Sequence, residues 1–452
     1  MCFFARIERI ETVLFVLIGG ESMGNCCEDF SAVCYEKADQ RIAALFDEGS
    51  FRGISSQAGC CCGPAGVVTG YGTVDGTTVF CYVQDRTVSE GAMDRTAAEK
   101  IKKIYSFAEK TGQPVVSVFD SNGGSLKKQQ KTLSAYGELI LASSRLSGVV
   151  PQIAVVCGPC GGSAALLAAA ADILIITRDG ELFAGQDEDG SADAAAKKGL
   201  ADFVVESEEE GMALARELIG YLPVNNLSAS PVFDAVEGAG GTPLTTLCDG
   251  GDLLEFKAAF ASDVKTGLCR IGGMVCGMVS AEGCLDEDGC AKAARFVRFC
   301  DAFSIPVVTL ADVCCMTDTA SAAKLASAYA EATTPKLACV TGKAIGAAFS
   351  VLAGKGAGAD LSLAFEDALI SALPEVTAVE ILYNDRIAAG ESREVLTAEY
   401  RKEASGLAAA RAGSVDEAIR PETLRSTVIS ALDMLSGKRE SRLPKKHSNQ
   451  PM

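Results

Sequence analysis

Two long stretches of the chain share one pattern of apolar and polar positions. Residues 98–120 and 291–312 each place apolar residues at helical spacing, then a proline, then an apolar run of β-formers that ends in Asp. The offset between matched positions is constant, since 292 minus 100 and 312 minus 120 both give 192. The matched positions are Lys100 and Lys292, Phe107 and Phe299, Pro114 and Pro306, and Asp120 and Asp312. Each stretch is predicted to form a helix, a turn and a buried parallel strand.

A second shared block indicates a strand, a sharp glycine turn and a helix of small residues. It reads PQIAVVCGPCGGSAALLA from Pro151 and PKLACVTGKAIGAAFSVLA from Pro335. Upstream of these blocks, residues 70–83 and 267–279 both read as glycine-turned hairpins. Gly158 matches Gly342 and Ala164 matches Ala348 with the same offset as the two prolines. Ala171-Asp172 matches Ala359-Asp360 with a similar offset. The chain is therefore predicted to contain one α/β domain in two copies.

The repeat sets the expected domain boundaries. Residues 23–221 are expected to form the N-terminal domain and residues 253–452 the C-terminal domain, while the proline- and glycine-rich residues 222–252 form a linker. Residues 1–22 match neither copy, and their apolar run TVLFVLIGG is too short to span a bilayer. The codons for Gly-Gly-Glu just before Met23 can spell a ribosome-binding site. We expect translation to begin at Met23 and residues 1–22 to be a gene-calling extension.

The amino-acid composition argues against several kinds of partner and site. The net charge of −18 argues against nucleic acid or an anionic membrane as a partner. The single histidine, His447, lies near the end of the chain beside Lys445 and Lys446, which argues against Ser-His-Asp triads and histidine metal sites. The nineteen cysteines show no module repeat, and the cluster Cys314-Cys315 lacks paired CxxC spacing. We therefore expect reduced structural thiols in a reducing cytoplasm, and no metal.

The stretch CGPC, Cys157 to Cys160, matches the dithiol motif of thioredoxins. The second copy carries Thr341 and Ala344 at the two cysteine positions, and the chain has no tryptophan. The thiols are thus dispensable to the element, which argues against a redox function. A glycine turn before a helix of small residues exposes backbone N–H groups that can stabilise an oxyanion. The alternative is that the glycines only let helix and strand pack closely.

The chain resembles the carboxyltransferase subunits of biotin-dependent acyl-CoA carboxylases and sodium-pumping decarboxylases, the family of propionyl-CoA carboxylase β and methylmalonyl-CoA decarboxylase α. The resemblance spans about residues 41–452. It rests on RIAALFDEGSF, GVVTGYGTVDG, SGVVPQIAVVCGPCGG, YLPVNN, EGCLDEDG, KAARFVRFCDAFSIPVVTL, AYAEATTPK, AVEIL and the tail KRESRLPKKHSNQP. It implies an α/β fold of duplicated crotonase-like (ClpP/crotonase) ββα superhelix domains, in agreement with the internal repeat.

The resemblance also implies two backbone oxyanion holes. The first maps onto Gly161, Gly162 and Ser163 and would hold the thioester carbonyl as it becomes an enolate. The second maps onto Ala347 and Ala348 and would hold the biotin ureido oxygen. Carboxybiotin then releases CO₂, the biotin takes the α-proton, and the acyl enolate captures CO₂; the reverse direction decarboxylates. Further substrate-binding positions are expected at Gly123, Gly124, Gly158, Gly346, Phe349 and Ser350.

The implied partners are an acyl-CoA and a separate biotin carboxyl carrier protein, since the chain has no biotinyl-lysine motif. A biotin carboxylase or a membrane decarboxylase subunit completes the system. The chain is expected to be a cytoplasmic homo-oligomer, a hexamer built as a trimer of dimers, lying peripheral to the membrane where it serves a decarboxylase pump. No nucleic-acid partner is expected.

Some family motifs are altered. The motif DSGGAR reads DSNGGS at residues 120–125, KAYGGAY reads KAIGAAF, and the Pro-Gly-Phe loop after Asp312 is missing. Two functions therefore remain open: an active carboxyltransferase subunit, or a catalytically altered paralogue that binds acyl-CoA or assembles with an active subunit. The acyl-CoA and the direction of the reaction also remain open.

Overall fold

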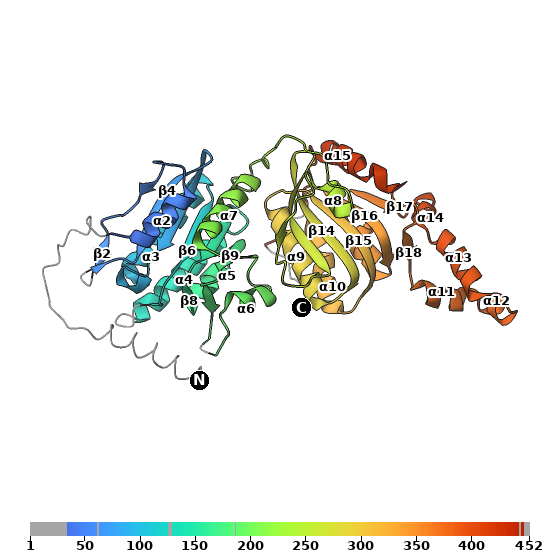
Figure 1. Cartoon of the computed structure of the whole chain (residues 1–452), viewed down its shortest axis with the longest axis horizontal. Coiled ribbons are helices and arrows are strands. Elements are labelled where there is room, and N and C mark those ends of the chain that lie inside the picture. Colours follow the sequence, from blue (N-terminus) through green and yellow to red (C-terminus); the bar gives the residue numbers. More distant parts are fainter. Residues whose placement is uncertain (1–33, 61–62, 125–128, 186, 443, 447–452) are drawn as a thin grey trace.

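The computed structural model describes residues 34–60, 63–124, 129–185, 187–442 and 444–446. The chain folds into two α/β halves, each built around one large sheet, which lie side by side along the long axis (Figure 1). The extension predicted for residues 1–22 lies outside the described residues. None of the helices in these ranges is long and apolar enough to cross a membrane.

The sheet of the first half is parallel over most of its width. Its strands, in spatial order, are β1 (Arg52–Gly53), β4 (Val67–Val74), β5 (Thr77–Gln84), β6 (Val115–Phe119), β7 (Gln152–Val156), β9 (Ile173–Thr177) and β11 (Phe203–Val205). Strands β4 and β5 form the predicted antiparallel hairpin, and the strands beyond β5 run parallel. The helices of this half are α2 (Glu36–Leu45), α3 (Arg95–Thr111), α4 (Gln129–Leu146), α5 (Ser163–Ala169), α6 (Ala192–Lys197) and α7 (Glu208–Tyr221). Strands β6, β7 and β9 are buried on both faces, as parallel strands between helical layers should be.

The sheet of the second half repeats this plan. Its strands, in spatial order, are β12 (Leu254–Phe256), β13 (Val264–Ile271), β14 (Met274–Leu285), β15 (Val307–Met316), β16 (Lys336–Ile345), β17 (Leu361–Phe365) and β19 (Glu417–Ile419), with β18 (Leu369–Ser371) paired to the end of β16. Strands β13 and β14 form the second predicted hairpin. Helices α9 (Glu287–Ala302), α10 (Thr319–Glu331), α14 (Gly406–Arg411) and α15 (Leu424–Leu435) belong to this half. Helices α11 (Glu375–Leu382), α12 (Asn384–Ala388) and α13 (Arg393–Glu403) form an arm that projects beyond the sheet (Figure 1).

Several short elements complete the chain. They are β2 (Gly59–Cys60), β3 (Gly63–Pro64), η2 (Ser89–Gly91), β8 (Pro159–Gly161), β10 (Glu181–Phe183), α8 (Pro243–Leu247), the π-helix η4 (Phe349–Ala353), η5 (Lys355–Ala357) and η6 (Pro421–Thr423). Strands β8 and β10 pair with each other and lie outside the main sheet of the first half. The segment 222–252, expected to be a linker, runs from the end of α7 to just before β12 and contains α8.

The helix–turn–strand units predicted from the pattern are present as α3–β6 and α9–β15. Both helices start in the same way, because Asp94 accepts a hydrogen bond from Ala97 N and Asp286 accepts one from Gly289 N. The matched lysines are both buried. Lys100 Nζ donates to the Val67 carbonyl at 2.6 Å and Lys292 Nζ to the Phe260 carbonyl at 2.8 Å, and burial lowers the pKa of each lysine to about 8. The constant offset between these two stretches therefore reflects shared capping and shared buried polar contacts.

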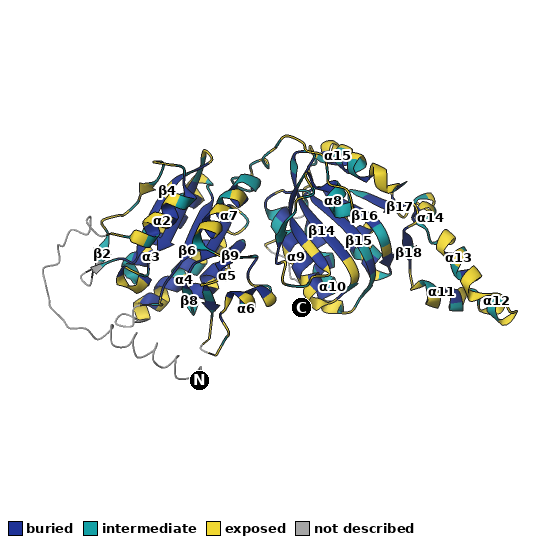
Figure 2. Cartoon of the chain, viewed as in Figure 1, coloured by how far each residue is buried: buried dark blue, intermediate teal, exposed yellow. Residues whose placement is uncertain are grey.

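The two halves pack directly against each other. The rings of Phe203 and Phe256 lie 4.8 Å apart, and Lys257 Nζ lies 3.0 Å from an Asp202 carboxylate oxygen. Arg295 of α9 donates to the carbonyl oxygens of Ala171 and Asp172. The buried core is continuous across this contact, and Figure 2 shows the strands of both sheets buried while exposed residues gather on the outer helices.

Candidate active site

Each half contains the same turn between a strand and a helix. In the first half, β8 pairs with β10, and Gly162 then turns the chain into α5. In the second half, the end of β16 pairs with β18, and Gly346 turns the chain toward η4. Gly162 N donates to the Phe183 carbonyl and Gly346 N to the Ser371 carbonyl, both at 2.8 Å. The second block of the predicted repeat thus corresponds to one hydrogen-bonded turn built twice.

The two turn glycines are required by their backbone conformation. Gly162 has φ of 62° and Gly346 has φ of 57°, in the left-handed region that side chains with a Cβ disfavour. A Cβ at Gly162 would meet no atom within 4 Å, so space does not explain the glycine there. The left-handed conformation turns the chain sharply, and small residues follow at the start of the helix.

Two backbone N–H groups after each turn glycine have no partner among the described residues. They belong to Ser163 and Ala164 in the first half and to Ala347 and Ala348 in the second. Such first-turn donors have no carbonyl partner within their own helix. Gly161, Gly162 and Ser163 are partly exposed and Ala347 is exposed, so an oxygen atom can approach both turns.

These contacts bear on the expected first hole. Gly162 N is paired with the Phe183 carbonyl in this structure, and the expected place of Gly162 in the hole stays a prediction. In a parallel strand only every second residue hydrogen-bonds to a given neighbouring strand. Gly161 N therefore points away from β10. The partner of Ala348 in the repeat is Ala164, which was not among the predicted site residues. The sequence repeat already matches these two alanines, so it could have placed Ala164 among the candidate site residues.

Gly158 and Gly342 serve close packing. A Cβ at Gly158 would clash with the carboxylate of Asp120, and a Cβ at Gly342 would clash with that of Asp312. Gly158 is buried, and the substrate contact expected for it stays a prediction. Close packing therefore accounts for the glycines at these two positions, which precede the turns.

A buried charge network supports the first turn from behind. Arg41 on α2 lies 2.7 Å from Asp120 and 2.6 Å from Glu208, and its guanidinium also donates to the Gln84 carbonyl. Burial would raise the pKa of Glu208, but the hydrogen bond from Arg41 and the charges around it outweigh burial, and the pKa falls below its ordinary value. The network fixes the end of β6 against Gly158 and hence against the turn.

The predicted positions Gly123 and Gly124 lie in the segment between β6 and α4. Ser121 N donates to the Pro159 carbonyl at 2.9 Å, which ties the segment after β6 to β8. Gly123 has φ of 119° and donates its N–H to Ser121 Oγ at 3.1 Å. A Cβ at Gly124 would approach Thr132 Cγ2 to 2.6 Å. Their expected contact with the substrate stays a prediction.

The predicted positions Phe349 and Ser350 lie in η4, just after the second turn. Phe349 packs on the core of the second half, while Ser350 is exposed and its N–H donates to the Gly346 carbonyl at 3.4 Å. A π-helix is wider than the α-helix that occupies the equivalent place in the first half.

Comparison with known proteins identifies the family. The sequence model described as Carboxyl transferase domain matches residues 36–450. The chain is 36% identical over 492 residues to the propionyl-CoA carboxylase beta chain of Saccharopolyspora erythraea, covering 92% of this chain and 90% of the relative. It is 32% identical over 476 residues to methylmalonyl-CoA decarboxylase subunit alpha of Veillonella parvula, covering 92% and 93%. The chain belongs to the carboxyltransferase family of biotin-dependent acyl-CoA carboxylases and decarboxylases.

A solved structure confirms the fold of this carboxyltransferase. The crystal structure of transcarboxylase 12S with methylmalonyl-coenzyme A and methylmalonic acid bound has a TM-score of 0.85 and 29% identity, and the match covers 99% of this chain and 98% of that chain. The predicted fold class, a duplicated crotonase-like α/β fold, is therefore confirmed.

The two cysteines of the CGPC motif of the carboxyltransferase form no disulfide in this structure. Cys157 and Cys160 are buried free thiols. Burial raises the pKa of Cys157 to about 12 and also raises that of Cys160, the reverse of the shift that makes a thiol reactive. These two cysteines fill the core, in line with the structural role predicted for them.

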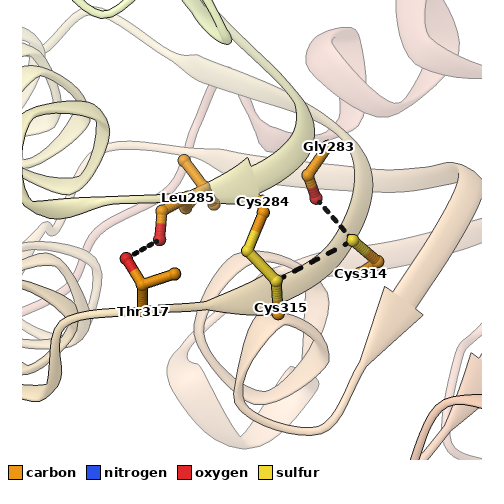
Figure 3. The surroundings of a disulfide bond; sticks show 6 residues. All are labelled: Gly283, Cys284, Leu285, Cys314, Cys315 and Thr317. Carbon is orange, nitrogen blue, oxygen red and sulfur yellow. Dashed lines mark hydrogen bonds between the residues drawn. A yellow bond between two sulfur atoms is a disulfide. The ribbon is translucent and has the colours of Figure 1, made fainter.

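The expectation that the cysteines are all reduced thiols is wrong for one pair. Cys284 at the end of β14 and Cys315 at the end of β15 form a disulfide, and Cys314 lies beside it (Figure 3). The contact was not visible in the sequence, because the two partners are 31 residues apart and only the pairing of β14 with β15 brings them together.

Proposed function

We propose that this chain moves a carboxyl group between carboxybiotin on a separate carrier protein and an acyl-CoA of the propionyl or methylmalonyl type. The observation that carries the proposal is the pair of matched turns in a chain of this family, each with small side chains and two N–H donors that find no partner within the described ranges. Two developing oxyanions need two such sites.

The first turn is the proposed acyl-CoA side. As the α-carbon of the acyl group loses its proton, the thioester oxygen gains negative charge. The N–H groups of Ser163 and Ala164, with Gly161 adjacent, are available to stabilise that charge by about 3 kcal/mol per well-aimed donor. The methylmalonyl-coenzyme A in the transcarboxylase 12S structure supports this choice of substrate class.

The second turn is the proposed biotin side. Ala347 is exposed and carries a single methyl group, so the approach to the two donors is open to a planar ureido ring. When bound, carboxybiotin supplies the carboxyl group and a ureido nitrogen that can take up a proton. Ala347 and Ala348 would orient the ureido oxygen, and the first turn would hold the acyl group ready. Holding the ureido oxygen in this way requires neither a metal ligand nor a histidine.

We propose that two copies of the chain complete the active centre. Large apolar side chains more than half exposed lie on α4 and α5 beside the first turn, and others lie on the arm. Figure 1 places α4 and α5 in the first half and the arm beyond the far side of the second half, so the two regions cannot cover each other within one copy. The residues are Leu133, Leu141 and Leu166 near the first turn, and Val376, Ile381, Leu382 and Val395 on the arm. The hexamer assembly named for transcarboxylase 12S supports a hexamer here.

One observation favours the altered paralogue as a second candidate. Strand β15 continues to Met316 in place of the Pro-Gly-Phe loop of relatives, and Cys315 ties its end to β14. A cleft-forming loop is thus replaced by an extended strand close to the second turn. In this case the chain would bind acyl-CoA without transfer.

A transfer assay separates the candidates. The full chain is incubated with a carboxylated biotin carrier and propionyl-CoA, carboxyl transfer is followed with labelled carboxylate, and acyl-CoA binding is measured by calorimetry. We expect transfer and binding together. Binding without transfer would favour the altered paralogue. Light scattering of the same sample should give a homo-oligomer, and an active monomer would contradict the proposed assembly.

A further inference from the structure

The three sulfur atoms of Cys284, Cys314 and Cys315 form a cluster outside the two turns. All three lie within 4.8 Å of one another, and the Sγ atoms of Cys314 and Cys315 are 3.9 Å apart. Figure 3 shows the three side chains converging from the ends of β14 and β15. They are the only group of three or more potential metal ligands found among the described residues.

A bulge in the sheet produces this convergence. Successive residues of a strand normally point to opposite faces. Here Gly283 pairs with Val313 and Cys284 with Cys315, so Cys314 is one extra residue on β15. Gly283 has φ of 79° at the same point, and its carbonyl accepts from Cys314 Sγ at 3.2 Å. The irregular backbone thus turns three thiols toward one point, a typical property of a bulge.

A disulfide alone uses only two of the three sulfurs. The Cα atoms of Cys284 and Cys315 are 4.8 Å apart, within the usual range for a bridge. Cys314 and Cys315 are neighbours in sequence, and their Cα separation of about 3.8 Å falls below that range. With Cys284 bonded to Cys315, Cys314 therefore has no disulfide partner in the cluster. A ligand that all three thiols can share accounts for its position.

We propose that the reduced cluster binds one thiophilic d¹⁰ cation, with Zn²⁺ as the representative ion. Zinc–sulfur bonds of about 2.3 Å at tetrahedral angles place two thiolates about 3.8 Å apart. The Cys314–Cys315 separation of 3.9 Å already matches this value. Three thiolates select zinc over calcium or magnesium, and none of the three residues is buried, so water can occupy the fourth position.

The cluster has a metal-free oxidised form and a metal-binding reduced form. A dithiol supplies two electrons and two protons and becomes a disulfide, whereas a phosphine supplies the two electrons, water supplies the two protons, and the oxygen of that water ends on phosphorus. In both cases the Cys284–Cys315 bond becomes two thiols. Binding of the cation then displaces the three thiol protons. The ion would fix the ends of β14 and β15 where the family loop is missing. Val313, adjacent to Cys314, pairs with Ala344, which shortly precedes Ala347, so the site lies at the same end of the sheet as the second turn.

Metal titration of the full chain tests the proposal. The protein is reduced with a phosphine under anaerobic conditions, freed of metal, and titrated with Co²⁺, whose thiolate charge-transfer absorption reports sulfur coordination. Zn²⁺ is then added in competition. We expect one Co²⁺ per chain, displaced by Zn²⁺. A reduced protein that binds no ion, or that keeps its disulfide under the reductant, would overturn the proposal.

Cys314→Ser is the sharpest variant, because it leaves both partners of the disulfide in place. We expect it to weaken binding by more than the roughly 10–100-fold that loss of an outer-sphere partner costs. Cys284→Ser should do the same and also abolish the disulfide. Cys34→Ser, at an exposed free thiol outside the cluster, is the matched control and should bind normally. Circular dichroism checks folding. Unchanged binding in Cys314→Ser would show that the ion sits elsewhere, and the proposal would fall without touching the proposed carboxyl transfer.

Discussion

The two halves of the carboxyltransferase share a backbone and differ in what surrounds it. Both turns use a glycine in the left-handed region, and both glycine N–H groups donate to a carbonyl at 2.8 Å. Behind the first turn, Asp120 is buried in an ion pair with Arg41. Behind the second, Asp312 accepts a backbone hydrogen bond from Lys343 N at 2.8 Å. The two halves share the turn that presents the N–H donors. This is expected if backbone groups, rather than side chains, perform the chemistry.

The Ala-Asp pairs extend this comparison. Gln152 N donates to the Asp172 carboxylate at 2.9 Å, and Lys336 N donates to that of Asp360 at 2.8 Å. Asp360 also pairs with Lys438 at 2.8 Å. Asp172 makes no ion pair within the described ranges, and burial raises its pKa to about 7. Asp172 and Asp360 thus accept the same backbone hydrogen bond in different electrostatic environments.

The largest difference is expected between Asp120→Ala and Asp312→Ala. The first leaves Arg41 buried without one of its two carboxylates and should cost about 3–5 kcal/mol of unfolding free energy. The second removes one hydrogen bond at a partly exposed site and should cost about 1 kcal/mol. Urea unfolding of the two variants measures both values. Equal costs would show that the network around Arg41 adds nothing to the first half.

The next effect concerns catalysis at the second turn. Ala347→Val places branched carbons in front of the two donors at an exposed position, so the protein should fold. Loss of one well-aimed donor contact should lower the rate of carboxyl transfer by roughly 10²–10³. Acyl-CoA affinity, measured by calorimetry, should change little.

Ser163→Val, the matched variant in the first half, should show the opposite pattern and weaken acyl-CoA binding. A folded Ala347→Val protein with full transfer activity would exclude Ala347 and Ala348 as a hole and would favour the altered paralogue.

The periodicity of the sequence was enough to predict the repeat, the two hairpins and the helix–strand units, because these depend on local apolar patterns and turn residues. It did not reveal that Gly162 N is occupied, because its acceptor, Phe183, comes from a separate strand further along the chain. The cysteine cluster was also missed, since it depends on a bulge between β14 and β15. Contacts between elements, rather than patterns within them, decided which predicted residues are free to act.

A smaller effect is expected from Asp172→Asn. The folded protein keeps a proton on Asp172 that the unfolded chain loses above about pH 4, so this group's contribution to stability is full below pH 4 and is lost as the pH rises through about 7. Asparagine keeps an acceptor for Gln152 N and carries no charge. Above pH 7 the variant should be more stable by roughly 1–2 kcal/mol, less than the full shift implies because the carboxylate keeps some hydration.

Unfolding midpoints between pH 5 and 8 should therefore flatten in Asp172→Asn. Asp360→Asn is the control from the other half. It removes one of the two carboxylate partners of Lys438 and should give no gain. A parent protein whose stability does not fall over this range would contradict the raised pKa.

The smallest effect is expected at the CGPC motif, where the second half supplies the substitution. Thr341 occupies the place of Cys157, and its hydroxyl donates to the Ala311 carbonyl at 3.4 Å. The residue that matches Ala311 is Phe119, whose carbonyl already accepts from Cys157 N at 2.9 Å. A threonine hydroxyl at position 157 would therefore find an acceptor in reach, which avoids the cost of an unpaired buried hydroxyl.

Cys157→Thr should cost about 1 kcal/mol or less and leave carboxyl transfer within a few-fold of the parent. The thiol has a pKa of about 12, so it stays protonated at neutral pH and has no thiolate to contribute. The reciprocal change Thr341→Cys should be equally mild, since each half then carries the other's residue. Loss of transfer that follows oxidation of Cys157 with Cys160 would instead make the motif a redox element, and the two turns would differ in chemistry as well as in surroundings.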